Sequence, residues 1–127
     1  MSFTISLSAR FKLIFYVPIS SLADCKAAVF AAGAGRYPGI GKYTEYCWTV
    51  LGTGQFRPGN AARPNIGKVG EVEEIEEARV ETLYLDEDMA KKAIKALKDK
   101  LWENAYDTRS AHPYEEPAYK VIKLEQF

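Results

Sequence analysis

Four stretches of the chain alternate apolar and polar residues, or run apolar for a few residues, as β-strands do. They are residues 11–17, 43–51, 71–85 and 119–124. β-Branched and aromatic residues are frequent in these stretches, and Pro18 ends the first of them. Alternation places Trp48 and Val50 on one face of the second strand, and Cys47 and Leu51 on the other. The pattern therefore predicts four strands.

Two further stretches repeat apolar residues at helical spacing. The first stripe consists of Leu22, Cys25, Ala28, Val29 and Ala32, and the second of Ala90, Ala93, Ile94, Leu97 and Leu101. Ser20 or Ser21 is expected to cap the first helix, and Gly33 to end it. Asp86 is expected to cap the second helix, whose wet face is rich in lysine. The chain thus has two predicted amphipathic helices.

The order of these elements is strand, helix, strand, strand, helix, strand. This order is typical of the split βαβ or ferredoxin-like fold, an α+β architecture with an antiparallel sheet and two helices on one face. A chain of 127 residues is long enough for one core. We therefore expect a single domain over residues 11–127, preceded by an N-terminal extension at residues 1–10.

The strands carry large apolar residues on both faces, although two helices can cover only one face of the sheet. Ile14 opposes Phe15, and Trp48 opposes Cys47 and Leu51. The second face is therefore expected to be buried by other copies of the chain. Three sheets packed face-inward would bury it and would also hide strand edges. We expect a homotrimer.

Residues 52–70 contain five glycines, two prolines and three cationic side chains, and they are expected to form a long irregular loop. Backbone N–H groups and arginines in such a loop can hold an anion. The alternative is a loop that clamps a neighbouring subunit. The candidate ligand-binding residues here are Gly52, Gly54, Phe56, Arg57, Arg63 and Lys68.

Residues 111–119 form the other chemically rich segment, Ala-His-Pro-Tyr-Glu-Glu-Pro-Ala-Tyr. Its two prolines favour an extended conformation that suits a sheet edge. The candidate site residues are His112, Tyr114, Glu115 and Glu116. His112 and the glutamates can form a proton-transfer or metal-binding cluster. Alternatively, His112 makes a hydrogen bond at a subunit contact while the glutamates pair with lysines.

Charge and composition exclude several partners. The net charge is zero and no basic reading helix is present, so we expect no nucleic-acid binding. No apolar run has transmembrane length, so we expect no membrane contact and a cytoplasmic location. Cys25 and Cys47 are expected to be buried free thiols, or else a disulfide. The acidic residues of 71–77 are either a solvated strand or a cation site.

Several of these segments together resemble a known family. They are Ala32 to Gly35, Tyr43 with Cys47, Gly52 to Pro58, Ile66-Gly67, Gly70 and, above all, residues 111–119. They resemble the domain inserted in NIF-three-like proteins, which are called GTP cyclohydrolase type 2 homologues, over Phe11 to about Leu124. That domain is in turn similar to CutA and to the PII signalling proteins. The resemblance implies a ferredoxin-like fold that assembles as a trimer.

Full-length members of that family bind two metal ions through residues outside the inserted domain. This sequence has one histidine, too few ligands for a dinuclear centre, so we expect no catalytic residues, no bound metal and no cofactor. The expected function is a non-enzymatic, trimeric ligand-sensing or protein-interaction module. The alternative is a metal-binding protein or small-molecule enzyme that uses His112 with Glu115 and Glu116.

A trimer of the kind that the resemblance implies would bring the glycine-rich loop of one subunit towards the proline segment of the next. We therefore expect one composite cleft at each subunit interface, lined by both segments. Such a cleft would suit a small metabolite with an anionic group, and a protein partner is the other candidate occupant.

Overall fold

The computed structural model describes residues 10–37, 43–60, 67–107 and 118–125. In chain order the elements are β1 (Arg10–Pro18), a 3-10 turn (Ile19–Ser21), α1 (Leu22–Ala31), β2 (Trp48–Phe56), β3 (Glu73–Tyr84), α2 (Glu87–Asp107) and β4 (Ala118–Leu124). The strands form one antiparallel sheet in the order β2-β3-β1-β4. The predicted ferredoxin-like fold is confirmed.

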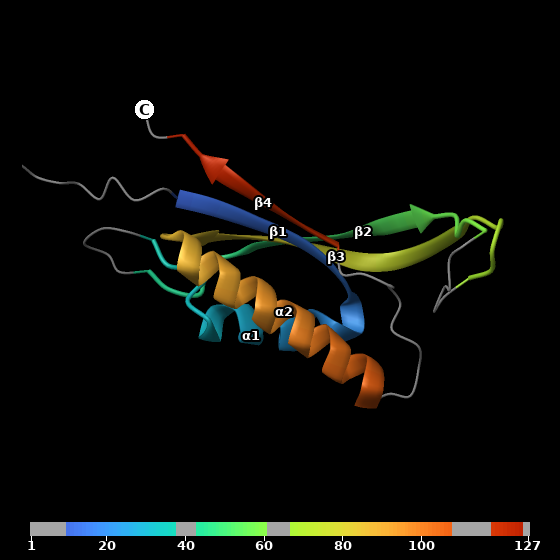
Figure 1. Ribbon diagram of the computed structural model, residues 1–127, viewed down its shortest axis with the longest axis horizontal. Helices are drawn as coiled ribbons and strands as arrows, with labels where there is room; N and C mark the ends of the chain where they lie inside the picture. Colours follow the sequence, from blue (N-terminus) through green and yellow to red (C-terminus); the bar gives the residue numbers. More distant parts are fainter. Residues whose placement is uncertain (1–9, 38–42, 61–66, 108–117, 126–127) are drawn as a thin grey trace, which may run out of the picture.

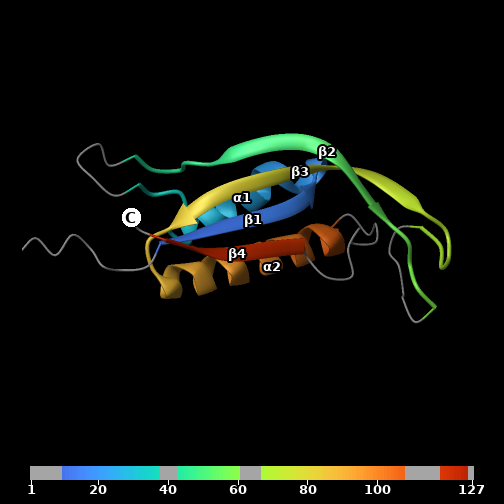
Figure 2. The same ribbon diagram turned by 90° about the horizontal axis from the view of Figure 1, so that it is seen from above.

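The molecule has two layers, because both helices lie on the same side of the sheet (Figure 1). Seen from above, β1 runs between β3 and β4, and β2 and β4 form the two edges of the sheet (Figure 2). The connections that cross from strand to strand through α1 and α2 place both helices on that one side. No helix of the described residues lies over the other face of the sheet (Figure 1).

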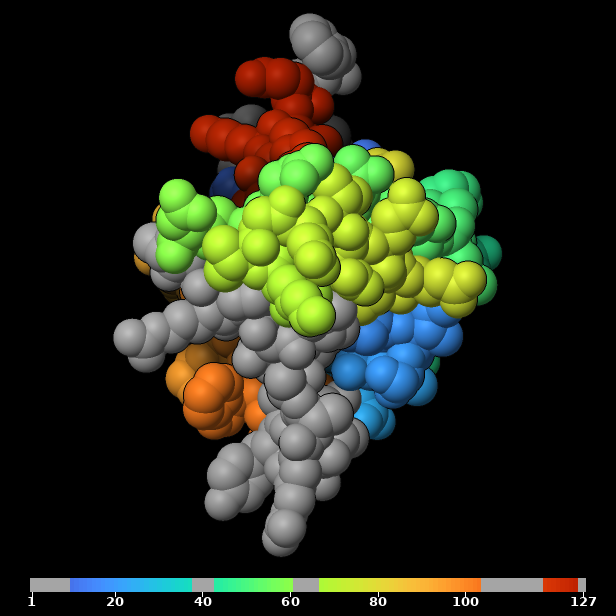
Figure 3. All heavy atoms as spheres, turned by 90° about the vertical axis from the view of Figure 1, so that its right-hand side faces the viewer, coloured from blue at the N-terminus to red at the C-terminus, as the bar shows by residue number. Residues whose placement is uncertain are grey.

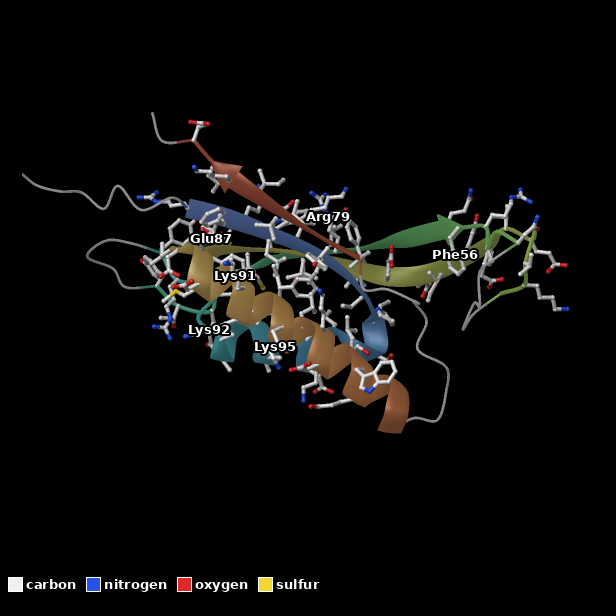
Figure 4. All side chains as sticks on the ribbon, in the orientation of Figure 1. Phe56, Arg79, Glu87, Lys91, Lys92 and Lys95 are labelled. Atoms are coloured by element: carbon white, nitrogen blue, oxygen red, sulfur yellow. The ribbon has the colours of Figure 1, made fainter. Side chains whose placement is uncertain are left out.

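The core lies between the sheet and the helices and is built from the predicted faces. Its fully or nearly fully buried members are Leu13, Phe15 and Val17 of β1, Ala78, Val80 and Tyr84 of β3, Cys25 and Val29 of α1, and Ala90, Ala93, Leu97 and Leu101 of α2. Alternate residues of each strand and the helical stripes thus point to one interior. The lysines of α2 lie on its outer side, where Figure 4 labels Lys91, Lys92 and Lys95.

The helix ends only partly follow the predicted caps. The backbone N–H of Met89 donates to Asp86 Oδ1 at 2.7 Å, so Asp86 caps α2 as predicted. Ser21 occupies the N-cap position of α1, but its side chain makes no capping hydrogen bond. The 3-10 turn directly before α1 supplies the entry to this helix instead. After α1 the chain turns at Gly33, where φ is +106°.

The prediction for the second strand and the loop after it was wrong in position. β2 begins at Trp48 rather than at residue 43, and it continues through Gly52 and Gly54 to Phe56. The backbone of residues 52–56 pairs in register with residues 77–73 of β3, and this pairing outweighs the low strand propensity of glycine at a sheet edge. A Cβ at Gly54 would collide with the Glu77 carboxylate, so glycine here makes room for that side chain. The described residues between β2 and β3, 57–60 and 67–72, are in neither helix nor strand.

Residues 43–47, which were predicted as strand, are held by single hydrogen bonds instead. The N–H of Tyr46 donates to Gly35 O at 2.8 Å, and the N–H of Gly35 donates to Leu83 O at 2.8 Å. Thr82 Oγ1 donates to Tyr46 O at 2.8 Å. Gly35 has φ +82°, and a Cβ there would approach the Tyr46 backbone to 2.8 Å. This close approach requires glycine.

Candidate functional site

The face of the sheet away from the helices, called the open face below, carries apolar side chains. The strand register places Trp48 and Val50 of β2, Ile14 of β1 and Ile122 of β4 on this face. Trp48 is 51% exposed, Ile122 44% and Val50 39%. Large apolar side chains exposed together on one sheet face mark a surface that another surface covers. The sequence prediction of apolar residues on both faces is confirmed at these positions.

Charged residues lie among these apolar side chains. Glu81 forms ion pairs with Arg79 and, at 3.6 Å, with Lys12. The Lys120 ammonium lies over the ring of Tyr16, 5.9 Å from its centroid. Figure 4 shows Arg79 projecting from the sheet on the side opposite α2. Its Nε is buried and makes no hydrogen bond to the described part of the chain.

These charges do not balance on the open face. The register places Arg10, Lys12, Arg79 and Lys120 on the same side of the sheet as Glu81. Two carboxylates, Glu81 and Glu77, lie among these four cations on that side of the sheet. This cluster was not predicted from the sequence, although Arg79 and Glu81 alternate with the buried Ala78, Val80 and Thr82.

A two-stranded ribbon projects beyond the end of β1. Pro18, the last residue of β1, pairs with Glu77, which in turn pairs with Gly52. Residues 53–56 of β2 and 73–76 of β3 extend past this row as a ribbon with no third strand (Figure 1). Figure 3 views the molecule from this end, with the yellow-green ribbon and its connection facing the viewer.

The connection at the tip of the ribbon is closed by its own hydrogen bonds. Arg57 Nη1 donates to Gly70 O at 2.7 Å, and the N–H of Gly70 donates to Pro58 O at 2.8 Å. Gly70 has φ +81°. One candidate ligand-binding side chain, Arg57, therefore also fixes the loop that presents it. Its guanidinium has further N–H donors that this bond does not use.

The predicted site residues fall into three groups. Gly52, Gly54 and Phe56 lie on β2, not in a loop. Arg57 and Lys68 lie exposed at the tip. The remaining candidates, Arg63, His112, Tyr114, Glu115 and Glu116, lie outside the described residues.

β4 begins near the end of the sheet from which the ribbon projects. β4 begins at Ala118, which pairs with Tyr16, two residues before the end of β1. The ribbon also leaves the sheet at the end of β1. The chain therefore enters β4 at the end of the sheet from which the ribbon projects.

The buried titratable groups are held neutral. Burial, with the neighbouring Asp24 carboxylate, raises the pKa of the Cys25 thiol to about 12. Burial also raises the pKa of Tyr84 above its ordinary value. Cys25 is therefore a thiol rather than a thiolate at neutral pH, which makes it a poor nucleophile and a poor metal ligand. Both cysteines are free.

The described residues hold neither a metal-ligand cluster nor a membrane-spanning helix. No group of three His, Cys, Asp or Glu side chains comes together there as metal ligands do. Neither of the helices in that part of the chain is long and apolar enough to cross a membrane.

No protein-family model matches the sequence, whereas individual proteins do. The GTP cyclohydrolase 1 type 2 homolog of Mycobacterium leprae is 39% identical over 113 residues, covering 89% of this chain and 26% of that protein. The Bacillus subtilis homolog is 36% identical over 115 residues, covering 91% of this chain and 27% of that protein. A Bacillus cereus protein related to NIF3 superposes with a TM-score of 0.69 at 30% identity, covering 94% of this chain and 26% of that one.

The fold defines the class, a ferredoxin-like domain in which both helices of the described residues lie on one face of the sheet. More particularly, the chain is a relative of one domain-sized segment of NIF3-related proteins named GTP cyclohydrolase 1 type 2 homologs. The resemblance that the sequence motifs indicate is confirmed. The chain spans about a quarter of the length of the curated relatives it matches.

Proposed function

We propose that the chain is a non-enzymatic homotrimeric module that binds a small polar ligand or a partner protein at its subunit clefts. The observation that supports this most is the open face. Trp48, Val50 and Ile122 are half-exposed on this face, whereas the other face of the sheet packs against the two helices in the core. A trimer with the three open faces inward removes these side chains from water.

The proposed clefts lie where the ribbon tip of one subunit meets the neighbour. Arg57 and Lys68 give this tip positive charge, and β4 begins at the same end of the sheet. His112, Tyr114, Glu115 and Glu116 would supply polar groups from that segment. A ligand with an anionic group fits such a lining. One charge-assisted hydrogen bond from Arg57 would contribute roughly 1.5–3 kcal/mol, about ten- to a hundredfold in affinity.

Native mass spectrometry of protein purified without a metal-affinity tag tests this proposal. The expected result is a trimer that retains a small polar molecule and less than one tightly held transition ion per chain by elemental analysis. A stoichiometric metal that is lost in His112→Ala would instead support the alternative metal-dependent function. Two metal ions per chain would refute the argument from the single histidine.

Variants at the ribbon tip locate the ligand. Lys68→Ala removes a tip charge without touching the Arg57 hydrogen bond to Gly70 that closes the loop. It should lower the affinity for the retained molecule, whereas Lys95→Ala, on the exposed side of α2, should leave it unchanged. Equal affinities for all three proteins would remove the tip from the site.

A further inference from the structure

Three exposed tyrosines lie at the end of the molecule opposite the ribbon. Tyr37 follows α1, and Tyr43 and Tyr46 lie just before β2. Figures 1 and 2 both show these two stretches, in cyan and teal, at the far end of the sheet from the yellow-green connection. The rings of Tyr37 and Tyr46 meet edge to face, with centroids 4.9 Å apart and planes at 79°. These two rings form a corner, called the aromatic corner below.

Backbone hydrogen bonds fix the aromatic corner against the end of the sheet. The N–H of Tyr37 donates to Tyr43 O at 3.0 Å, and the N–H of Tyr46 donates to Gly35 O at 2.8 Å. The buried Thr82 hydroxyl donates to the carbonyl oxygen of Tyr46. Because the backbone that carries both rings is already ordered, little conformational entropy is lost when a ligand binds there. The aromatic corner is therefore a preorganised surface.

Other tyrosine rings of this chain show which ligand suits such a surface. The Lys98 ammonium lies 5.2 Å from the centroid of the Tyr119 ring, and the Lys120 ammonium lies over the ring of Tyr16. A cation is attracted to the negative face of an aromatic ring. No cation of the described residues lies over either ring of the aromatic corner. The corner can therefore accept a cation from another molecule.

Negative charge lies beside the aromatic corner. Glu45 is exposed, forms no ion pair with any residue that the structure describes, and has φ +56°, which residues other than glycine seldom adopt. Partial burial, then the neighbouring Tyr37 and the Glu81 carboxylate, raise the pKa of Tyr46, so a carboxylate that is also paired within the sheet acts on this ring. Arg36, which precedes Tyr37, makes neither an ion pair nor a ring contact with the described residues. The exposed Glu45 carboxylate is thus available to a cation from outside.

We propose that the aromatic corner binds an arginine side chain of a partner protein. A guanidinium is planar, stacks on aromatic rings and donates to carboxylates, so it can lie against the rings of Tyr37 and Tyr46 while it pairs with Glu45. This site is at the opposite end of the molecule from the ribbon tip, where the proposed ligand is anionic. The inference therefore goes beyond the proposed function and does not depend on trimer formation.

A tripeptide with a single arginine tests the site. Acetyl-Gly-Arg-Gly-amide, added to the ¹⁵N-labelled full chain, should shift the NMR amide signals of residues 35–37 and 43–48 to saturation. Acetyl-Gly-Gln-Gly-amide, which carries no charge, should leave these signals in place. Tyr37→Leu removes one ring and should raise the dissociation constant of the arginine peptide by about two- to fivefold. Tyr37→Phe keeps the ring and is the matched control, for which the constant should be unchanged.

Several results would overturn the inference. They are the absence of saturable shifts with the arginine peptide, equal shifts with the glutamine peptide, shifts confined to the acidic residues of 71–77, and a dissociation constant in Tyr37→Leu equal to that of the wild type. If Tyr37→Leu fails to fold by circular dichroism, Glu45→Gln tests the same site. It should raise the constant by a similar factor because it removes the carboxylate, and an unchanged constant in this variant would also overturn the inference.

Discussion

Tyr84 is a fully buried side chain whose hydroxyl makes no hydrogen bond within the described part of the chain. A buried hydroxyl without a partner lowers the free energy of unfolding by about 1–3 kcal/mol relative to an apolar group of the same shape. Its ring, by contrast, packs in the core at the end of β3, next to α2. The ring and the hydroxyl of this residue therefore act in opposite directions on stability.

Tyr84→Phe should raise the free energy of unfolding by about 1 kcal/mol, because it keeps the ring and removes the unpaired hydroxyl. Urea denaturation followed by circular dichroism measures the change. Tyr119→Phe is the control, since Tyr119 is only partly buried and its contact with Lys98 uses the ring. A loss of stability in Tyr84→Phe would mean that the hydroxyl has a partner.

Cys25 makes the free energy of unfolding decrease as the pH rises above 9. Burial raises its pKa from 9.0 to about 12 in the folded protein, so the unfolded chain loses this proton first. The stability that the neutral thiol contributes is complete below pH 9 and is lost as pH rises, at about 1.4 kcal/mol per pH unit. Between pH 9 and 10.5, the free energy of unfolding should therefore fall by about 2 kcal/mol less in Cys25→Ala than in the wild-type protein. Identical slopes in the two proteins would show that Cys25 ionises normally when folded.

At the scale of elements, α2 depends on one specific cap. Asp86→Ala removes the acceptor for the Met89 N–H and should lower the free energy of unfolding by about 1 kcal/mol. Asp86→Asn keeps an acceptor oxygen and should recover most of that loss. Asp88 lies in the exposed first turn of α2, so Asp88→Ala removes only a favourable charge. It should lower the free energy of unfolding by less than half as much as Asp86→Ala does. Thermal unfolding ranks the three variants, and equal losses for Asp86→Ala and Asp88→Ala would exclude a specific capping role.

The element boundaries show what the sequence could and could not predict. Period-two and helical patterns located β1, β3, α2 and the core, because side chains such as Phe15 and Leu97 have to point to one interior. The run of glycine, threonine and glutamine after Leu51 has no such pattern, and it was predicted as a loop. It is a strand because β3 offers a partner backbone at Glu73 to Glu77, and a cross-strand partner is invisible to local propensity.

The candidate site was predictable to a similar extent. The alternation in the strands indicated an uncovered apolar face, since Ile14 and Trp48 oppose residues of the other face. The excess of positive charge on that face was not predictable, because it depends on the register that places Lys12, Arg79 and Lys120 together. The candidates of 111–117, including His112, stay predictions.

At the scale of the whole molecule, the proposed trimer requires that the open face is buried between subunits. Val50 lies there opposite Arg79, so Val50→Glu offers Arg79 a partner within its own chain and puts a carboxylate into the proposed interface. This variant should sediment as a monomer that keeps the far-ultraviolet circular dichroism of the folded chain. Leu51→Glu, at the next residue and on the other side of β2, should remain a trimer. A trimeric Val50→Glu protein would show that this part of the face is not buried between subunits.

The most direct test is the mass of the wild-type protein in solution. Multi-angle light scattering at micromolar concentration should give three times the chain mass of 14.2 kDa, about 43 kDa. The trimer should persist on dilution, because an apolar face on each chain is removed from water. A single well-behaved species of 14.2 kDa, with Trp48 and Ile122 exposed to solvent, would contradict the account.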